Sequence, residues 1–286
     1  MSCYGDEVLK KIYIELSDSC GLKCSFCPIE KNKRPKMTLD RFEKIIFEIA
    51  SHKIFSKARI CLHILGDPCR RSDLLDFIYI LEKFCLKLDL VTSGYYQVNE
   101  KILDFHCLNQ IAFSLDAGLD PNNPQKKDYL ERILDFCALH MHKRSKSFIN
   151  LRMQNISLDK NRVFLNQIFS FFKIQPNFSC FSRIKLAEYI FLVITQNFQW
   201  AGFSEDFTER RFCHGVKNQV GILSDGRVVP CCIDGSGKIV LGDIRYQKLE
   251  EILNSKRAIA MKQSFERGVA LEPLCQNCHF PIKSEI

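Results

Sequence analysis

Residues 11–27 read KIYIELSDSCGLKCSFC, a short apolar stretch followed at once by three cysteines. The apolar residues of 11–16 predict a β-strand. Cys20, Cys24 and Cys27 then have the spacing C-x3-C-x2-C on the loop that leaves this strand. Cysteine thiolates are the usual protein ligands of iron–sulfur clusters. Three of them can hold three irons of a four-iron cluster and leave one iron open, as a catalytic metal centre requires.

Zinc is the alternative for these three cysteines. A zinc site needs a fourth ligand, for which His52 or His63 could be proposed, but neither has supporting spacing. The chain has 15 cysteines in 286 residues. Under reducing conditions, clustered cysteines indicate metal or redox chemistry rather than disulfides. We therefore favour an iron–sulfur cluster at this loop.

Along the chain, short apolar runs alternate with longer amphipathic stretches. Thr38, for example, is a candidate N-cap before Phe42, Ile45, Ile46 and Ile49 at helical spacing. The predicted strands are 11–16, 58–65, 86–91, 110–115, 148–153 and 183–186. Repeated strand–helix units imply a parallel sheet with right-handed crossovers. Because six units fall short of the eight of a closed barrel, the sequence predicts an α/β fold built on a partial (β/α)6 barrel, with its functional loops after the strands.

The pattern changes after about residue 200. Two apolar runs, 220–223 and 228–229, flank Asp225–Gly226, which is a strong hairpin signal. A helix from Leu249 to about Phe265 is predicted next. We therefore predict two domains, 1–200 for the partial barrel and 201–286 for a small C-terminal β-hairpin and helix domain.

Four cysteines of this C-terminal region share a second pattern: Cys213, Cys231, Cys275 and Cys278, in the form C-x12-G-x4-C…C-x2-C. The hairpin turns at Gly226, so Cys213 and Cys231 can approach each other while the last pair closes the site. Four thiolates suit either zinc or a fully ligated cluster, and the residues alone leave these nearly even. The first cysteine motif favours a cluster.

Two ambiguities accompany this second motif. Cys232 could replace Cys231 as a ligand, although the spacing from the glycine favours Cys231. His214 and His279 adjoin the cysteines and could contact the ligands or simply lie at the surface.

Charge and hydropathy exclude some classes of function. The formal net charge is +8, but lysines and arginines are interspersed with acidic residues and no basic tract with interleaved aromatics occurs. This argues against nucleic acid as a partner. A basic entrance to the site that attracts an anionic substrate is still compatible with the sequence. The apolar run 190–194 is too short to cross a bilayer, and residues 1–11 lack a signal peptide. A cytoplasmic protein with no membrane partner is expected.

The first motif resembles that of the radical S-adenosylmethionine superfamily, C-x3-C-x-aromatic-C after the first strand of a partial (β/α)6 barrel, with Phe26 as the aromatic residue. In that family the open iron binds the amino and carboxylate groups of S-adenosyl-L-methionine. Reductive cleavage then gives a 5′-deoxyadenosyl radical, which abstracts hydrogen from the substrate. The resemblance implies a [4Fe-4S] cluster and S-adenosyl-L-methionine as cofactors.

Later positions resemble the same family. Gly66–Asp67–Pro68 looks like its Gly-Glu-Pro motif, whose backbone meets the amino group of the cofactor, with Asp in place of Glu. Thr92–Ser93–Gly94 stands where Thr-Asn-Gly is frequent. Ser114 and Asp116 match a Ser-x-Asp that approaches the ribose or carboxylate, and Arg152 stands where an arginine pairs with the carboxylate. Each of these residues also has a purely structural explanation. Ser114 could cap a helix, Asp116 could begin a turn, and Arg152 could form a structural ion pair. The implied cofactor-binding set is Phe26, Gly66, Asp67, Pro68, Ser93, Ser114, Asp116 and Arg152.

The C-terminal segment resembles the twitch domain, the shortened form of the SPASM extension of these enzymes. Supporting residues are 229–232, 241–244 and 249–253. No cysteine follows Cys278, so one auxiliary [4Fe-4S] cluster is expected.

The resemblance implies a radical enzyme, and family members with one auxiliary cluster include dehydrogenases. We expect a two-electron oxidation of a small molecule, with the auxiliary cluster as electron acceptor and a donor such as flavodoxin or ferredoxin. Only nineteen residues precede Cys20, which leaves no room for a leader-binding domain. The alternatives are a peptide- or protein-modifying maturase, a radical enzyme acting on RNA, and a non-catalytic zinc- or cluster-stabilised binding protein. No general base can be assigned.

Overall fold

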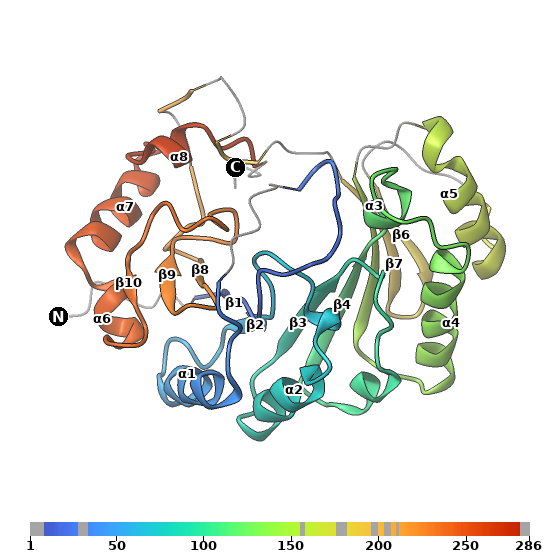
Figure 1. Cartoon of the computed structure of the whole chain (residues 1–286), viewed down its shortest axis with the longest axis horizontal. Helices are drawn as coiled ribbons and strands as arrows, with labels where there is room; N and C mark the ends of the chain where they lie inside the picture. Colours follow the sequence, from blue (N-terminus) through green and yellow to red (C-terminus); the bar gives the residue numbers. More distant parts are fainter. Residues whose placement is uncertain are drawn as a thin grey trace.

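The computed structural model describes residues 9–27, 34–154, 158–175, 182–195, 200–202, 207–209 and 212–280. Its strands form a single ten-stranded sheet in the order β10-β9-β8-β1-β2-β3-β4-β5-β7-β6. Figure 1 shows the sheet between the C-terminal helices at one end of the molecule and α4 and α5 at the other. The predicted α/β class with an open sheet is confirmed.

Neighbouring parallel strands form the centre of the sheet. They are β1 (Lys11–Ile14), β2 (Arg59–Cys61), β3 (Leu88–Thr92), β4 (Leu108–Ser114) and β5 (Phe148–Gln154). Each lies within one of the predicted strands or overlaps it closely. Because these strands are parallel, the loops that follow them all leave from the same edge of the sheet.

The sixth parallel strand is not the one that the sequence predicted. The predicted strand at 183–186 is β6 (Ser182–Ala187), which lies at the edge of the sheet and pairs antiparallel with β7 (Ile190–Thr195). It is β7 that pairs parallel with β5. The two strands are joined by a tight turn, with φ +60° at Tyr189, and so short a connection can only produce an antiparallel pair.

The crossover helices pack against one face of the sheet, which we call the outer face (Figure 1). They are α1 (Leu39–Ser51), α2 (Leu74–Lys83), α4 (Tyr129–His142) and α5 (Leu158–Phe172). Shorter turns are η1 (Pro68–Arg70), η2 (Glu100–Asp104) and α3 (Asp116–Leu119). The predicted start of α1 is confirmed, since the Thr38 side chain accepts a hydrogen bond from the Arg41 N–H at 3.3 Å.

The C-terminal hairpin extends the sheet. β8 (Gln219–Ile222) pairs parallel with β1, and β9 (Arg227–Val229) pairs antiparallel with β8 around Gly226, whose φ is +100°. β10 (Gly242–Asp243) completes this edge. The predicted helix after residue 249 is interrupted at Asn254: α6 (Leu249–Leu253) ends there and Ser255 caps α7 (Lys256–Glu266), followed by α8 (Pro273–Gln276). The domain boundary near residue 200 stays a prediction.

Two apolar clusters stabilise this arrangement. The larger one lies between the sheet and the helices and includes Ile12 and Ile14. The smaller one contains Tyr13, Cys61, Ile64, Leu223 and Val229, with Cys232 packed against it. Because successive residues of a strand point to opposite faces, Tyr13 lies on the inner face of the sheet, opposite the helices.

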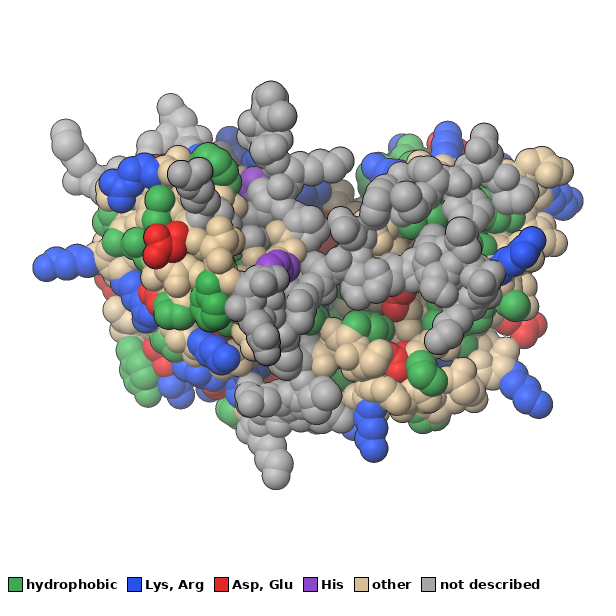
Figure 2. Space-filling view, turned by 90° about the horizontal axis from the view of Figure 1, so that it is seen from above, with side chains coloured by type: hydrophobic (Ala, Val, Ile, Leu, Met, Phe, Trp, Pro, Cys, Tyr) green, Lys and Arg blue, Asp and Glu red, His purple; other side chains and the backbone are tan. Residues whose placement is uncertain are grey.

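The surface carries mixed charge. In Figure 2, Lys and Arg side chains stand singly around the described part of one face, with Asp and Glu between them. In the described part of the chain, no helix has the length and apolar character needed to span a membrane.

Candidate active site and cluster-binding residues

The loop with the first three cysteines is held by residues that follow β4. Asn123 accepts a hydrogen bond from the Lys23 N–H at 2.7 Å, and its own amide nitrogen donates to the Cys24 sulfur at 3.1 Å. Asp120 accepts from the Ser25 N–H at 2.6 Å and from the Ser25 hydroxyl at 2.7 Å. These two buried side chains therefore fix the path of the cysteine loop before any cluster binds.

The three thiols lie partly buried and near one another. Burial, and then the negative charge of Asp67 together with Cys24 and Cys27, raises the pKa of Cys20 to about 12. Burial also raises the pKa of Cys24. A thiol in such surroundings becomes a thiolate when a metal supplies positive charge, which is the behaviour of a metal ligand. Phe26 is half-buried in the same loop.

The Gly66–Asp67–Pro68 loop and the end of β3 are joined by one carboxylate. Asp67 accepts hydrogen bonds from the Thr92 hydroxyl at 3.0 Å and the Ser93 N–H at 2.9 Å, and also from the Ser93 hydroxyl. It also accepts from the Cys69 N–H at 2.9 Å, which caps η1. The Asp67 side chain is therefore engaged in connecting two loops, so the backbone around Gly66 is the part that remains to meet a ligand.

Gly66 itself lies against the loop that follows β1. Its φ is +75°, and a β-carbon there would come 2.1 Å from the Ser17 carbonyl oxygen. Only glycine fits this position, because any side chain would collide with backbone. The loops after β1, β2 and β3 thus form one contiguous structure.

Ser114, Asp116 and Arg152 occupy the ends of β4 and β5. Ser114 is the Cα partner of Arg152 in the parallel register, and Asp116 accepts a hydrogen bond from the Gln154 N–H at 3.0 Å. Burial raises the pKa of Asp116 to about 6, although this hydrogen bond and the Arg152 charge oppose the rise. The Tyr129 hydroxyl donates to the Ser93 carbonyl at 2.6 Å and so connects α4 to the same edge. The structure therefore brings the predicted cofactor residues to one edge of the sheet.

The four cysteines of the second motif line one small cavity. Cys213, Cys231, Cys275 and Cys278 surround it together with apolar side chains such as Ile239 and Leu274. The Cys232 thiol instead contacts Tyr13 on the inner face. This placement separates the two adjacent cysteines that the sequence left ambiguous, with Cys231 at the cavity.

The donor set fits an iron–sulfur cluster. Sulfur donors in apolar surroundings are typical of cluster sites. Among the described residues, no group of three or more His, Cys, Asp or Glu side chains is arranged to hold a metal ion as placed. His214 contacts the Asn218 side chain at 3.0 Å.

Several residues of the site were not predicted from the sequence. Asp120 precedes Pro121, and Asn123 lies between Pro121 and Pro124, in a segment without a regular apolar pattern. Tyr96 donates a hydrogen bond to the Cys20 carbonyl, and Glu15 binds Arg34 in a buried ion pair at 2.8 Å. These contacts join residues that are not neighbours in the sequence, so no local sequence pattern predicts them.

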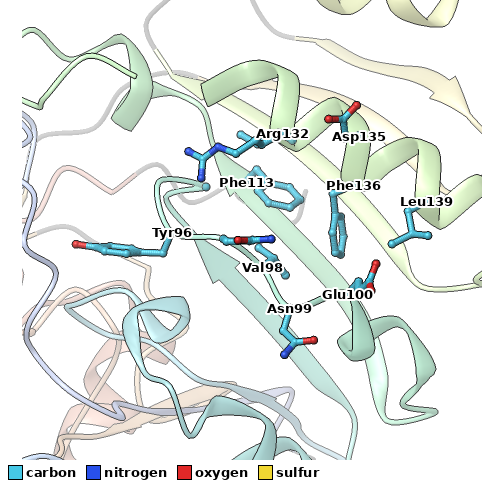
Figure 3. Close-up of a pocket in the computed structure, with 12 residues that line it drawn as sticks. Tyr96, Val98, Asn99, Glu100, Phe113, Arg132, Asp135, Phe136 and Leu139 are labelled. Atoms are coloured by element: carbon cyan, nitrogen blue, oxygen red, sulfur yellow. The ribbon is translucent and has the colours of Figure 1, made fainter. Parts of the chain in front are cut away.

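A separate cavity of about 700 Å³ lies outside the sheet, between the segment that follows β3 and α4. Figure 3 shows Phe113, Phe136 and Leu139 along this cavity, with Tyr96 at one end, pointing away from the others. None of the eight predicted cofactor-binding residues lines it. This cavity is therefore adjacent to the first cysteine loop, which Tyr96 contacts, but is not the predicted cofactor site.

A family model for the SPASM iron–sulfur cluster-binding domain matches residues 213–279. Residues 213–279 therefore match a SPASM domain. The match includes all four cysteines at the cavity. None of the curated proteins matches the chain significantly.

Solved structures share the fold of the whole chain. BtrN in complex with AdoMet and 2-DOIA aligns with a TM-score of 0.62 at 16% identity, over 95% of this chain and 93% of BtrN. Streptococcus suis SuiB bound to the precursor peptide SuiA aligns with 0.60 at 14%, over 94% and 71% of the two chains. Native anSMEcpe with bound AdoMet and the Cp18Cys peptide aligns with 0.62 at 14%, over 94% and 88%. With the SPASM domain, these neighbours confirm the resemblance to radical S-adenosylmethionine enzymes that carry a SPASM or twitch extension.

Proposed function

We propose that this protein is a radical S-adenosylmethionine oxidoreductase with two [4Fe-4S] clusters. The observation that carries the proposal is the pairing of two cysteine sites on one sheet. Three cysteines lie on the loop after β1, beside the ends of β2 to β5, and four more surround the SPASM cavity. BtrN and anSMEcpe were both solved with bound AdoMet, which supports the same cofactor here.

In this proposal Cys20, Cys24 and Cys27 ligate the first cluster and leave its fourth iron for S-adenosyl-L-methionine. When bound, that cofactor supplies the 5′-deoxyadenosyl radical that abstracts a hydrogen atom. The backbone at Gly66, which is pressed against the Ser17 carbonyl, meets the amino group, and the Arg152 guanidinium pairs with the carboxylate. Asn123 holds Cys24 in place through its N–H···S contact.

The substrate that we propose is a small molecule oxidised by two electrons, with the SPASM cluster taking one of them. The support is that BtrN, solved in complex with 2-DOIA, matches this chain over nearly the full length of both. SuiB extends beyond the match, which covers 71% of it. A cytoplasmic location and a flavodoxin or ferredoxin as donor complete the proposal.

A peptide substrate is the second candidate. It is favoured by the similar TM-scores of SuiB bound to the precursor peptide SuiA and anSMEcpe with the Cp18Cys peptide. The two candidate functions differ in the kind of substrate that must enter the site. A binding screen with short peptides and with small polyols therefore separates them.

Anaerobic reconstitution followed by iron and sulfide counting and detection of 5′-deoxyadenosine tests the proposal. We expect about eight irons per chain and nucleoside formation after reduction. Changing Cys20, Cys24 and Cys27 to Ala should remove about half of the iron and all of the nucleoside. Cys85→Ala, at an exposed cysteine outside both motifs, is the matched control and should leave both unchanged. Protein with intact clusters that forms no 5′-deoxyadenosine would refute the proposal.

A further inference from the structure

Cys231 and Cys232 are adjacent, yet their thiols lie in different environments. Cys231 lines the SPASM cavity, whereas Cys232 packs against the smaller apolar cluster on the inner face. The two sulfur atoms therefore have different neighbours. This short segment connects the cavity with the inner face of the sheet.

The segment lies beside the middle of β1. Tyr13 is level with Gly221 of β8, and Gly221 is level with Val229 of β9. Because β9 runs antiparallel to β8 and β1, the chain leaves β9 towards the end of β1 where Lys11 lies, whereas Cys20 follows the other end. Tyr13 therefore lies between the start of this segment and the first cysteine loop.

Tyr13 makes the contact with Cys232. Its side chain is 8% exposed, and its hydroxyl is hydrogen-bonded to the Cys232 thiol. Burial raises the pKa of Tyr13 far above its usual range, so the phenol stays protonated and donates. The opposite side of Tyr13 meets the His63 ring edge to face, with ring centroids 5.4 Å apart.

His63 is the polar residue on the side of Tyr13 that faces away from Cys232. Its Nδ1 atom is buried and has no hydrogen-bond partner among the described residues. Burial, with the charges of Arg152 and Lys11, lowers the pKa of His63 to about 3, so the ring is neutral. The influence of the Arg152 charge on His63 places the end of β5 near the same space. A buried ring nitrogen without a partner is costly unless a ligand satisfies it.

We propose that Tyr13 and Cys232 are positioning residues that couple the SPASM cluster to the inner face of the sheet, where His63 offers its free nitrogen to a hydrogen-bond donor of the substrate. The proposal rests on the proposed function, in which the SPASM cluster accepts an electron from that side. Hydrogen bonds and burial around the sulfur atoms set the potential of a cluster, and outer partners of the ligands tune it. The row from His63 through Tyr13 and Cys232 ends at Cys231, a predicted ligand.

Anaerobic potentiometry followed by electron paramagnetic resonance of the cluster-loaded protein tests this coupling without a substrate. Tyr13→Phe should retain its iron and shift the midpoint potential of the SPASM cluster to a lower value, because a hydrogen-bond dipole near the cluster is lost. Cys232→Ala should give a shift of the same sign, and the double variant should add nothing further, since both changes remove one contact. Tyr95→Phe is the control, because its hydroxyl donates to the Pro124 carbonyl instead.

Three results of these measurements would contradict the coupling. Equal potentials in wild type, Tyr13→Phe and Cys232→Ala would overturn the coupling while leaving the proposed function intact. Loss of the SPASM iron in Cys232→Ala would also overturn it, by showing that Cys232 is a ligand. A wild-type protein that loads only the first cluster would overturn the proposed function and the coupling with it. If Tyr13→Phe does not fold, Cys232→Ala alone carries the test.

Discussion

At the scale of single residues, side chains of the site hold its loops in place through hydrogen bonds. The loop backbone then stays available to a ligand. Asp67 shows this best, because its carboxylate is occupied by Thr92, Ser93 and the Cys69 N–H. An Asp here is one methylene shorter than the Glu of the resembling motif, and its carboxylate stays beside its own loop. The recognition of a ligand at this loop therefore depends on the conformation of Gly66.

Replacing Gly66 by Ala should remove S-adenosyl-L-methionine binding and destabilise the protein by more than about 2 kcal/mol. A positive φ alone costs about 1–2 kcal/mol for a residue with a β-carbon, and the Ser17 carbonyl must also move. Gly202→Ala is the matched control, since Gly202 has φ +89° but its β-carbon would meet nothing closer than 3.4 Å. Calorimetric titration and thermal unfolding measure both effects. Equal losses in the two variants would show that the clash is unimportant.

Asp116 predicts a pH dependence. The folded protein raises its pKa to about 6, above the value of about 3.9 expected in the unfolded chain. Between these values the native state binds more protons, so the stability contributed by this group falls as pH rises. Asp116→Asn should therefore be more stable than wild type at pH 7, by about 2–3 kcal/mol, and the gain should vanish near pH 4. Unfolding at several pH values under anaerobic conditions measures the difference, and a constant difference would contradict the assignment.

At the scale of elements, periodicity predicted most of the strands and helices but not their partners. The start of α1 and the turn at Gly226 follow from local signals, a cap and a positive φ. The pairing of β8 with β1 joins residues more than two hundred positions apart, and no short pattern encodes it. The same reason explains why β7 was missed, because its apolar run 190–194 resembles any buried segment until its neighbours are known. The cysteine motifs were visible because their chemistry demands fixed spacing.

The ion pair of Glu15 and Arg34 contacts the C-terminal region through Ser224 and the Gly235 carbonyl. Glu15 is fully buried and also accepts hydrogen bonds from the Ser224 hydroxyl at 3.0 Å and the Leu65 N–H at 3.1 Å. Glu15→Gln should cost about 3–5 kcal/mol, because it removes the carboxylate that binds the buried guanidinium through two hydrogen bonds and leaves only the more distant Asp18, at 3.9 Å. Glu43→Gln is the control, since its pair with Lys83 is exposed and should cost far less. Urea unfolding measures both, and similar costs would contradict a special role for the buried pair.

At the scale of the whole molecule, one sheet carries two cysteine sites. The first follows β1 directly, and the second is reached through β8, β9 and the chain to α8. In the proposed function, a substrate on the inner face meets the radical at the first site and gives an electron to the second. The two sites are independent in their ligands, since they share no cysteine.

Cys278→Ala should therefore separate the two sites. We expect the iron content to fall by about half, while reductive formation of 5′-deoxyadenosine from S-adenosyl-L-methionine continues, because Cys20, Cys24 and Cys27 are untouched. The variant should also unfold at a lower temperature, since four thiolates on one cluster hold α8 and the cysteine tail against the sheet, and metal-binding energy is folding energy. Cys137→Ala, at a buried cysteine outside both motifs, controls for the loss of a thiol as such. Loss of the nucleoside together with the iron would contradict this independence, because it would show that the first site depends on the second. The two cysteine sites and the inner face would then form one functional unit.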